Sequence, residues 1–229
     1  PGYQTKTVPI TLAPSGMVVG QNVSVQNTAN ANTLTGLSLE GVAYRLDPGT
    51  GATAKVQTIR GGYTVEIGLT SSQPAIGTVP STVSFTGNGN GYGPEFTFTP
   101  LAEGSTVLTV TQPTGWQTPS NWASLTVNVS APSMSLFQTP FRVGRDLQFP
   151  TTLRLAAAAP TGGTTATITS QSPSLLLSTV RAAAGSSSIT LDIQQGQTQS
   201  ATFYVQSLSD SGTATMTFSA PRFATGSFD

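Results

Sequence analysis

The sequence predicts an all-β protein built from two tandem β-sandwich domains. Three observations indicate this fold class. Apolar and polar residues alternate in short runs with a period of two, which is typical of half-buried strands. Gly, Pro, Asn and Ser separate these runs, and no segment has the 3.6-residue period of an amphipathic helix. The two halves of the chain also repeat one another, which indicates duplicated modules rather than one large barrel.

In the first half, a strand is expected wherever the alternation places apolar side chains on one face. The segment 7–12 predicts a first strand with Val8, Ile10 and Leu12 facing inward, and the segment 63–70 is equally regular. The expected strands of this half are 7–12, 23–26, 63–70, 82–86, 95–99, 106–111 and 124–129.

The second half carries the same pattern over a shorter length. Residues 188–193 are the clearest case, because Ile189, Leu191 and Ile193 alternate with polar residues. The expected strands of this half are 134–137, 147–155, 165–169, 188–193, 201–205 and 213–218.

Internal matches set the domain boundaries. MVVGQNVSV at 17–25 parallels FRVGRDLQF at 141–149, and LTSSQPAI at 69–76 parallels ITSQSPSL at 168–175. The offset between the halves falls from the first match to the second. We therefore predict one domain over 1–131, with an insertion at about 27–62, and a second domain over 132–229.

A longer match identifies a family resemblance. FTFTPLAEGSTVLTVTQPTGW at 96–116 parallels FYVQSLSDSGTATMTFSAPRF at 203–223. Together with the SSQP and SQSP stretches, this pattern resembles the bacterial immunoglobulin-like (Big-type) repeats of large secreted and surface proteins. The resemblance implies immunoglobulin-like sandwiches, an extracellular or cell-surface location, and a stalk, spacer or adhesion role. It brings no catalytic residues with it.

The end of the second domain departs from the repeat. The first domain closes with ASLTVNV at 123–129, and aligning Phe228 with Trp122 predicts that the second domain lacks this final strand. An open sandwich edge invites pairing with another chain. The exposed acceptor edge is expected to consist of Ala214, Met216, Phe218 and Phe228.

Two explanations of the open edge remain at this point. A longer repeat array would supply the missing strand from further along the chain. Alternatively, a strand of a neighbouring copy fills the gap and links subunits into a filament by strand donation. The expected donor is the N-terminal segment that contains Thr7, Val8, Ile10 and Leu12.

Composition excludes several classes of function. Charged residues make up 8% of the chain, against about 25% in typical globular domains. Nine basic residues balance nine acidic ones without a basic stripe, so nucleic acid is not an expected partner. The chain has no His and no Cys, which removes the usual general base and zinc ligands. We therefore expect no catalytic residues, no cofactor and no metal. We also expect no membrane insertion, because no apolar run approaches the roughly 20 residues that a membrane-spanning helix needs.

Aromatic residues offer the alternative function of a carbohydrate-binding module. Tyr92, Trp116 and Trp122 are candidates for stacking on sugar rings, although core packing explains the two tryptophans more simply. The sequence thus predicts a non-enzymatic extracellular structural or adhesive protein, whose partners are copies of itself or neighbouring immunoglobulin-like domains. A glycan-binding module or an accessory domain of a secreted enzyme is the alternative.

Overall fold

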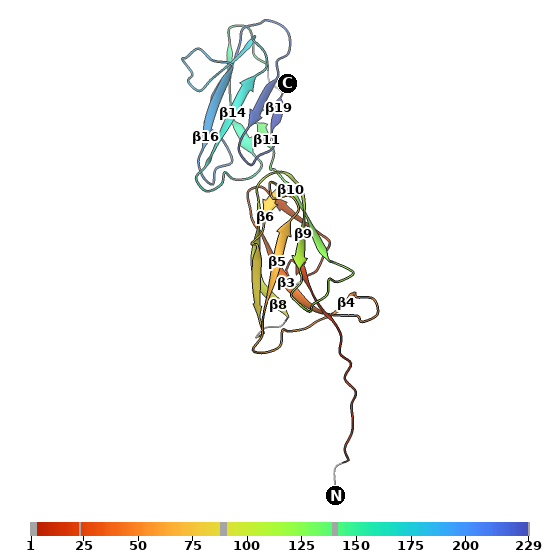
Figure 1. Ribbon diagram of the computed structural model, residues 1–229. Coiled ribbons are helices and arrows are strands. Elements are labelled where there is room, and N and C mark those ends of the chain that lie inside the picture. The colour runs from red at the N-terminus through yellow and green to blue at the C-terminus, as the bar shows by residue number, and fades with distance from the viewer. Residues whose placement is uncertain (1–3, 23, 88–90, 139–141, 229) are drawn as a thin grey trace. The chain divides into compact units, whose positions relative to one another are not determined.

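The computed structural model describes residues 4–22, 24–87, 91–138 and 142–228. Within these residues the protein is all-β and contains no helix, as the alternation predicts (Figure 1). The described residues therefore contain no helix that could span a membrane. Contacts divide the chain into a first unit, residues 1–31 and 35–129, and a second unit, residues 32–34 and 130–229.

Two sheets enclose the core of the first unit. One has the order β1–β3–β8–β6 with β4 beside β3, and the other has the order β2–β10–β9–β5–β7. Both sheets contribute side chains to one apolar cluster, including Phe98, Ile67 and Val127, which are fully buried. The bounds are β1 (Ser15–Gly20), β2 (Thr28–Asn32), β3 (Leu37–Leu46), β4 (Thr53–Val56), β5 (Thr64–Ser71), β6 (Gly77–Thr78), β7 (Thr82–Thr86), β8 (Tyr92–Pro100), β9 (Gly104–Thr111) and β10 (Ser124–Ser130).

The second unit repeats this plan with shorter strands. Its larger sheet has the order β16–β14–β18–β19, and it faces the strands β12–β17–β15 and the pair β11–β13 across one apolar cluster. The bounds are β11 (Met134–Leu136), β12 (Gln148–Thr151), β13 (Leu153–Leu155), β14 (Thr164–Ser170), β15 (Leu175–Ser178), β16 (Ser188–Ile193), β17 (Phe203–Ser207), β18 (Met216–Ser219) and β19 (Gly226–Phe228).

Strand pairing shows which parts of the two units correspond. In the first unit β9 lies between β5 and β10, and in the second β18 lies between β14 and β19. Gly104 is the first residue of β9 and Gly212 precedes β18, and both have a positive φ, 144° and 105°. Thus β10 and β19 occupy equivalent places, as do β9 and β18.

Glycine is required around one core ring of the first unit. A Cβ added to Gly93 would lie 1.4 Å from a ring carbon of Phe85, and a Cβ added to Gly41 would lie 2.1 Å from the same ring. Two strands, β3 and β8, therefore pass close to the ring only because these positions carry no side chain.

Three sequence predictions need correction here. The segment 7–12 forms no strand, and neither do residues 24–26, while Val23 lies outside the described residues. At the place where the final strand was expected to be missing, the second unit has β19, which pairs with β18. Apart from these corrections, the segment 27–62, predicted as an insertion, contains β2, β3 and β4, of which β3 is an inner strand of its sheet between β1 and β8.

Candidate functional site

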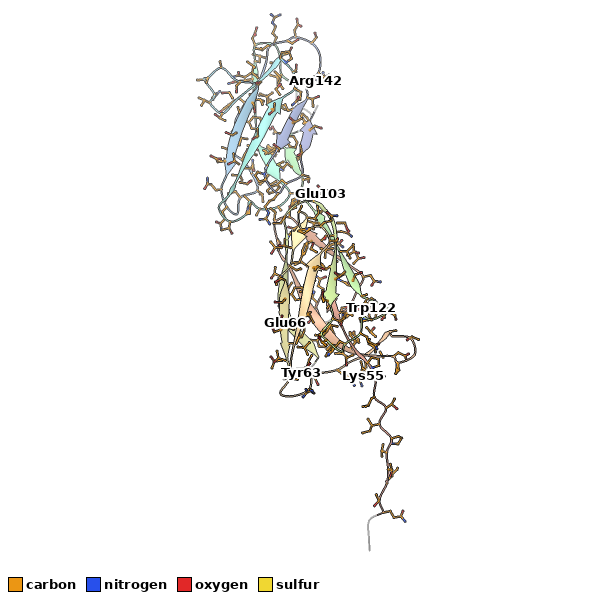
Figure 2. The ribbon with its side chains drawn as sticks, in the orientation of Figure 1. Lys55, Tyr63, Glu66, Glu103, Trp122 and Arg142 are labelled. Carbon is orange, nitrogen blue, oxygen red and sulfur yellow. The ribbon has the colours of Figure 1, made fainter. Side chains whose placement is uncertain are left out.

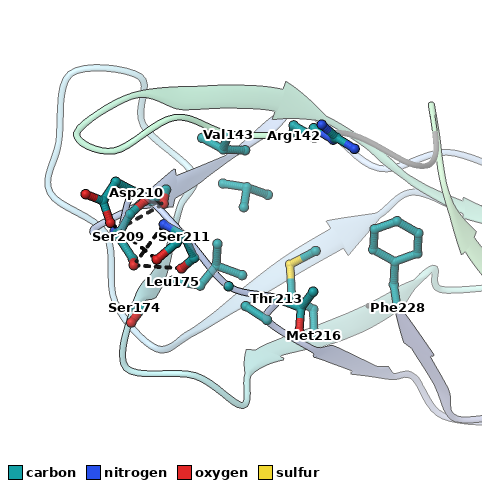
Figure 3. Close-up of a pocket in the computed structure, with 14 residues that line it drawn as sticks. Arg142, Val143, Ser174, Leu175, Ser209, Asp210, Ser211, Thr213, Met216 and Phe228 are labelled. Atoms are coloured by element: carbon teal, nitrogen blue, oxygen red, sulfur yellow. Dashed lines mark hydrogen bonds between the residues drawn. The ribbon is translucent and has the colours of Figure 1, made fainter.

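A hollow of the second unit lies beside the start of β18 and the residues that precede this strand. It has a volume of about 550 Å³ and combines apolar side chains with a rim of serines (Figure 3). Leu175, Val205 and Met216 form its apolar wall, and Phe228 stands at one end. We call this hollow the β18 groove. Its lining residues are Arg142, Val143, Ser174, Leu175, Val205, Ser207, Ser209, Asp210, Ser211, Gly212, Thr213, Ala214, Met216 and Phe228.

The first unit shows what fills the equivalent space. There β10 lies against β9 and buries three alternate side chains, Leu125, Val127 and Val129, whose exposed fractions are 1%, 0% and 4%. Leu125 pairs with Leu108, Val127 with Thr106 and Val129 with Gly104. One closing strand therefore covers β9 from Gly104 to Thr109.

In the second unit β19 lies beside β18 only at the place that corresponds to Leu125, the first of these three side chains. Phe228 pairs with Met216, as Leu125 pairs with Leu108, so Phe228 corresponds to Leu125. This corrects the sequence alignment of Phe228 with Trp122 by three residues, because pairing register and not residue type fixes the correspondence. The places of Val127 and Val129 have no equivalent side chain among the residues that the structure describes, and the β18 groove lies there.

The backbone along the groove is open for pairing. Residues 212–215 correspond to the first part of β9, yet they belong to no strand. Within the described part of the chain, Gly212 and Ala214 make no backbone hydrogen bond. Ala214 is half-buried, whereas its equivalent Thr106 is 1% exposed. The segment thus offers the donors and acceptors of an uncovered strand edge.

Serines order the rim of the groove. Ser207 Oγ donates to the carbonyl of Ser209 at 2.9 Å, and Ser209 Oγ donates to the carbonyl of Ser211 at 2.8 Å. These side-chain bonds hold the turn before Gly212 without using the backbone of the groove edge. The groove is therefore bordered by a fixed polar loop and walled by apolar side chains.

Three of the four predicted acceptor residues line the groove. Ala214, Met216 and Phe228 do so, with Met216 buried beneath the surface. Phe218 lies two residues after Met216 in β18 and pairs with Gly226 of β19. Its side chain is 3% exposed and packs in the core. Sequence reasoning missed Leu175 and Val205, which approach from the opposite sheet.

The predicted donor segment is exposed and extended. Val8, Ile10 and Leu12 are 67%, 85% and 88% exposed, and Thr7 is exposed as well. Figure 1 shows this segment running away from the sheets of the first unit as an extended trace. Three large apolar side chains at alternate positions thus stay in solvent, which is unusual for a strand-like sequence.

The predicted sugar-stacking aromatics lie in different surroundings. Trp116 is half-buried against the core of the first unit and lines a hollow of about 290 Å³ with Tyr44 and Tyr63. Trp122 packs on Tyr44 with their ring centroids 6.5 Å apart, while Tyr92 lines a separate hollow. Figure 2 labels Tyr63 and Trp122 on this unit. The three candidates therefore form no single platform.

The carboxylates form no metal or catalytic cluster in the described residues. Asp47 instead closes a turn: its Oδ1 accepts bonds from the N–H groups of Gly49 and Thr50 and from the hydroxyl of Thr50. These bonds stabilise the charged carboxylate, and the backbone bond from Thr50 in particular lowers the pKa of Asp47 below its usual value. Asp47 thus belongs to a tight turn in the stretch LDPGTG at 46–51.

Comparisons with known proteins do not assign this chain to a family. No protein-family model matches the chain, and no curated protein matches it in sequence. Among the solved structures that match is the Yersinia pseudotuberculosis adhesin InvE, at a TM-score of 0.33 and 13% identity. The match covers 93% of this chain and 57% of the adhesin chain, so this chain spans little more than half of that protein.

Proposed function

We propose that the protein is a non-catalytic extracellular structural or adhesive protein, a stalk segment or filament subunit, whose copies join by strand donation. In this proposal the segment Thr7–Leu12 of one copy enters the β18 groove of another. The observation that carries it is the presence, in one chain, of an uncovered apolar groove and an exposed strand-like segment with large apolar side chains at alternate positions.

The chemistry of the two partners is complementary. Among the described residues, no side chain takes the places of Val127 and Val129 in the groove, and the backbone groups of Gly212 and Ala214 make no hydrogen bond. The donor segment can supply two inward side chains and partners for these backbone groups, because every second side chain is apolar and its backbone is extended. Strand addition of this kind uses main-chain hydrogen bonds for affinity and alternate side-chain pockets for specificity.

The surface and the residue content support a structural role. The chain has neither His nor Cys, and its strands carry more Thr and Ser than charged residues. Thr70 and Thr109, for example, bond to one another at 2.6 Å across β5 and β9. A polar, nearly uncharged sheet surface suits spacing and lateral contact better than steering of a charged substrate.

Sedimentation velocity and negative-stain electron microscopy of the 229-residue chain test the proposal. We expect oligomers at high concentration, and we expect Ile10→Asp to abolish them because a charge would enter an apolar groove. Thr11→Asp is the matched control, since it adds the same charge on the opposite face of the segment and should leave association intact. A chain that stays monomeric throughout, or equal loss in both variants, refutes strand donation.

A carbohydrate-binding role is a second proposal, and one hollow of the first unit favours it. Tyr63 and Trp116 line this hollow, and the Arg60 guanidinium lies 4.4 Å from the Tyr63 ring centroid. Aromatic faces beside guanidinium donors are suited to sugar rings and their hydroxyls. A glycan array with the unchanged chain and with Tyr63→Ala tests it: a glycan bound only by the unchanged chain supports this role, and no bound glycan refutes it.

A further inference from the structure

Pro9 lies in the middle of the donor segment, between Val8 and Ile10. We infer that the donated segment runs antiparallel to β18, as β19 does, and that Ile10 and Leu12 enter the β18 groove in the places that Val127 and Val129 hold in the first unit. This inference rests on the proposed function and adds a direction and a register to it.

The direction follows from the hydrogen bonds of β10. In the first unit the N–H of Thr126, whose side chain faces outward, donates to the carbonyl of Asn27 at 2.8 Å on the β2 side. Its inward-facing neighbours Leu125 and Val127 therefore direct their backbone groups toward β9, because successive residues of a strand face opposite sides. Residues with outward side chains thus need no N–H on the β9 side.

A donor in the β10 direction places Pro9 at such an outward position. Its missing N–H then faces away from β18 and costs no hydrogen bond to the acceptor. Reversing the segment while keeping its apolar side chains inward would turn the backbone of Pro9 toward β18, where an N–H is needed. Pro9 therefore selects the antiparallel direction.

The register follows from the size of the groove. In the first unit the ring of Phe98 reaches Gly77, and Ile76 lies against Gly104, the partner of Val129. Pairing in β6–β8 and β15–β17 gives the equivalents in the second unit. Ile76 is replaced by Ser174, Gly77 by Leu175, Phe98 by Val205, Pro100 by Ser207 and Thr106 by Ala214.

Only Leu175 among these replacements is larger than its counterpart, so together they widen the space. A pair of valines would leave that space partly empty, whereas Ile10 and Leu12 are each larger by one carbon atom and fill it better. The alternative register, shifted by two residues, would insert Val8 and Ile10 and leave Leu12, which is 88% exposed, in solvent.

Val8 also favours this register. If Ile10 takes the position equivalent to Val127, Val8 takes the position equivalent to Leu125. Phe228 already occupies that position in the second unit. The segment must therefore leave the sheet before Pro9. A proline at that point is suited to the departure, since it needs no donor partner and restricts its own backbone.

Disulfide mapping tests the register, and the absence of Cys makes every disulfide assignable. Thr11 should face Thr213, as Asn128 faces Ser105 in the first unit. Such a non-hydrogen-bonded pair has a Cα separation of about 4.5 Å, within the roughly 4.4–6.8 Å range of disulfides. A T11C chain mixed with a T213C chain in a glutathione buffer should yield at least about tenfold more heterodimer than P9C with T213C.

The outcomes separate this inference from the proposed function. Preferential linkage of P9C to T213C would overturn the register, because it reports the two-residue shift. Oligomers in sedimentation without either linkage would overturn both register and direction while leaving strand donation in place. Monomers throughout, with no heterodimer, would refute strand donation itself, as when the groove is instead filled by a following part of the same chain.

Discussion

Replacing Leu12 by Ala should weaken association without changing the fold of either unit. Leu12 is 88% exposed in the free chain, so its truncation removes no intramolecular packing. In the proposed complex it takes the place of Val129, which is 4% exposed. Burying a leucine side chain contributes about 1.5–3 kcal/mol. Because Ala retains a small part of this, we expect a loss of about 1.5–2 kcal/mol, a rise in Kd of roughly 10- to 30-fold.

Titration of a labelled peptide covering residues 4–13 into the full chain measures this change directly by fluorescence anisotropy. The Leu12→Ala peptide should shift the binding curve by that factor, whereas Thr11→Ala, on the outward face, should shift it by less than about threefold. Equal Kd values for the Leu12→Ala and unchanged peptides would refute the burial of Leu12. Circular dichroism of the full-length Leu12→Ala chain should show an unchanged melting temperature.

Three further predictions follow from the structure. Val205→Phe should narrow the β18 groove and weaken peptide binding at least about tenfold, and unchanged affinity would contradict the groove as the site. Gly93→Ala should lower the free energy of unfolding of the first unit by about 1–3 kcal/mol in chemical denaturation, because the added carbon meets the Phe85 ring. Gly62→Ala is the comparison: no atom lies within 4 Å of its added carbon but φ is +70°, so it measures backbone strain without overpacking. The Asp47 carboxyl should titrate by NMR below the usual aspartate pKa. Its stabilising bonds are then present above the unfolded pKa and lost only as pH falls through the lower folded value, so a midpoint at or above the usual value would contradict the turn geometry.

Strands with one buried face could be predicted from the sequence. The predicted bounds 82–86 and 188–193 match β7 and β16, and 63–70 differs from β5 by one residue at each end. In these strands apolar and polar side chains alternate because one face is buried and the other meets solvent.

Strands β1 and β3 could not be predicted in this way. Residues 16–20 of β1 are all buried or nearly so, and residues 39–43 of β3 are buried in succession, including Glu40 at 7% exposure. Burial on both faces removes the alternation on which the prediction depends. No strand was therefore predicted at β3, although it pairs with β8.

The candidate groove was half predictable. The alternation of Val8, Ile10 and Leu12 was visible in the sequence, but only the structure shows that this segment joins neither sheet of its own unit and stays exposed. Leu175 and Val205 are far from β18 along the chain, and only the sheet-on-sheet packing brings them to the same groove.

The amino-acid sequence alone determined the all-β class, the duplication and the polar, nearly uncharged surface, because these depend on local alternation and composition. Tertiary structure decided that Phe228 of β19 pairs with Met216 of β18 and that a groove lies beside this pair. The physical reason is that strand register and cavity shape arise from pairing between distant segments. No local pattern carries that information.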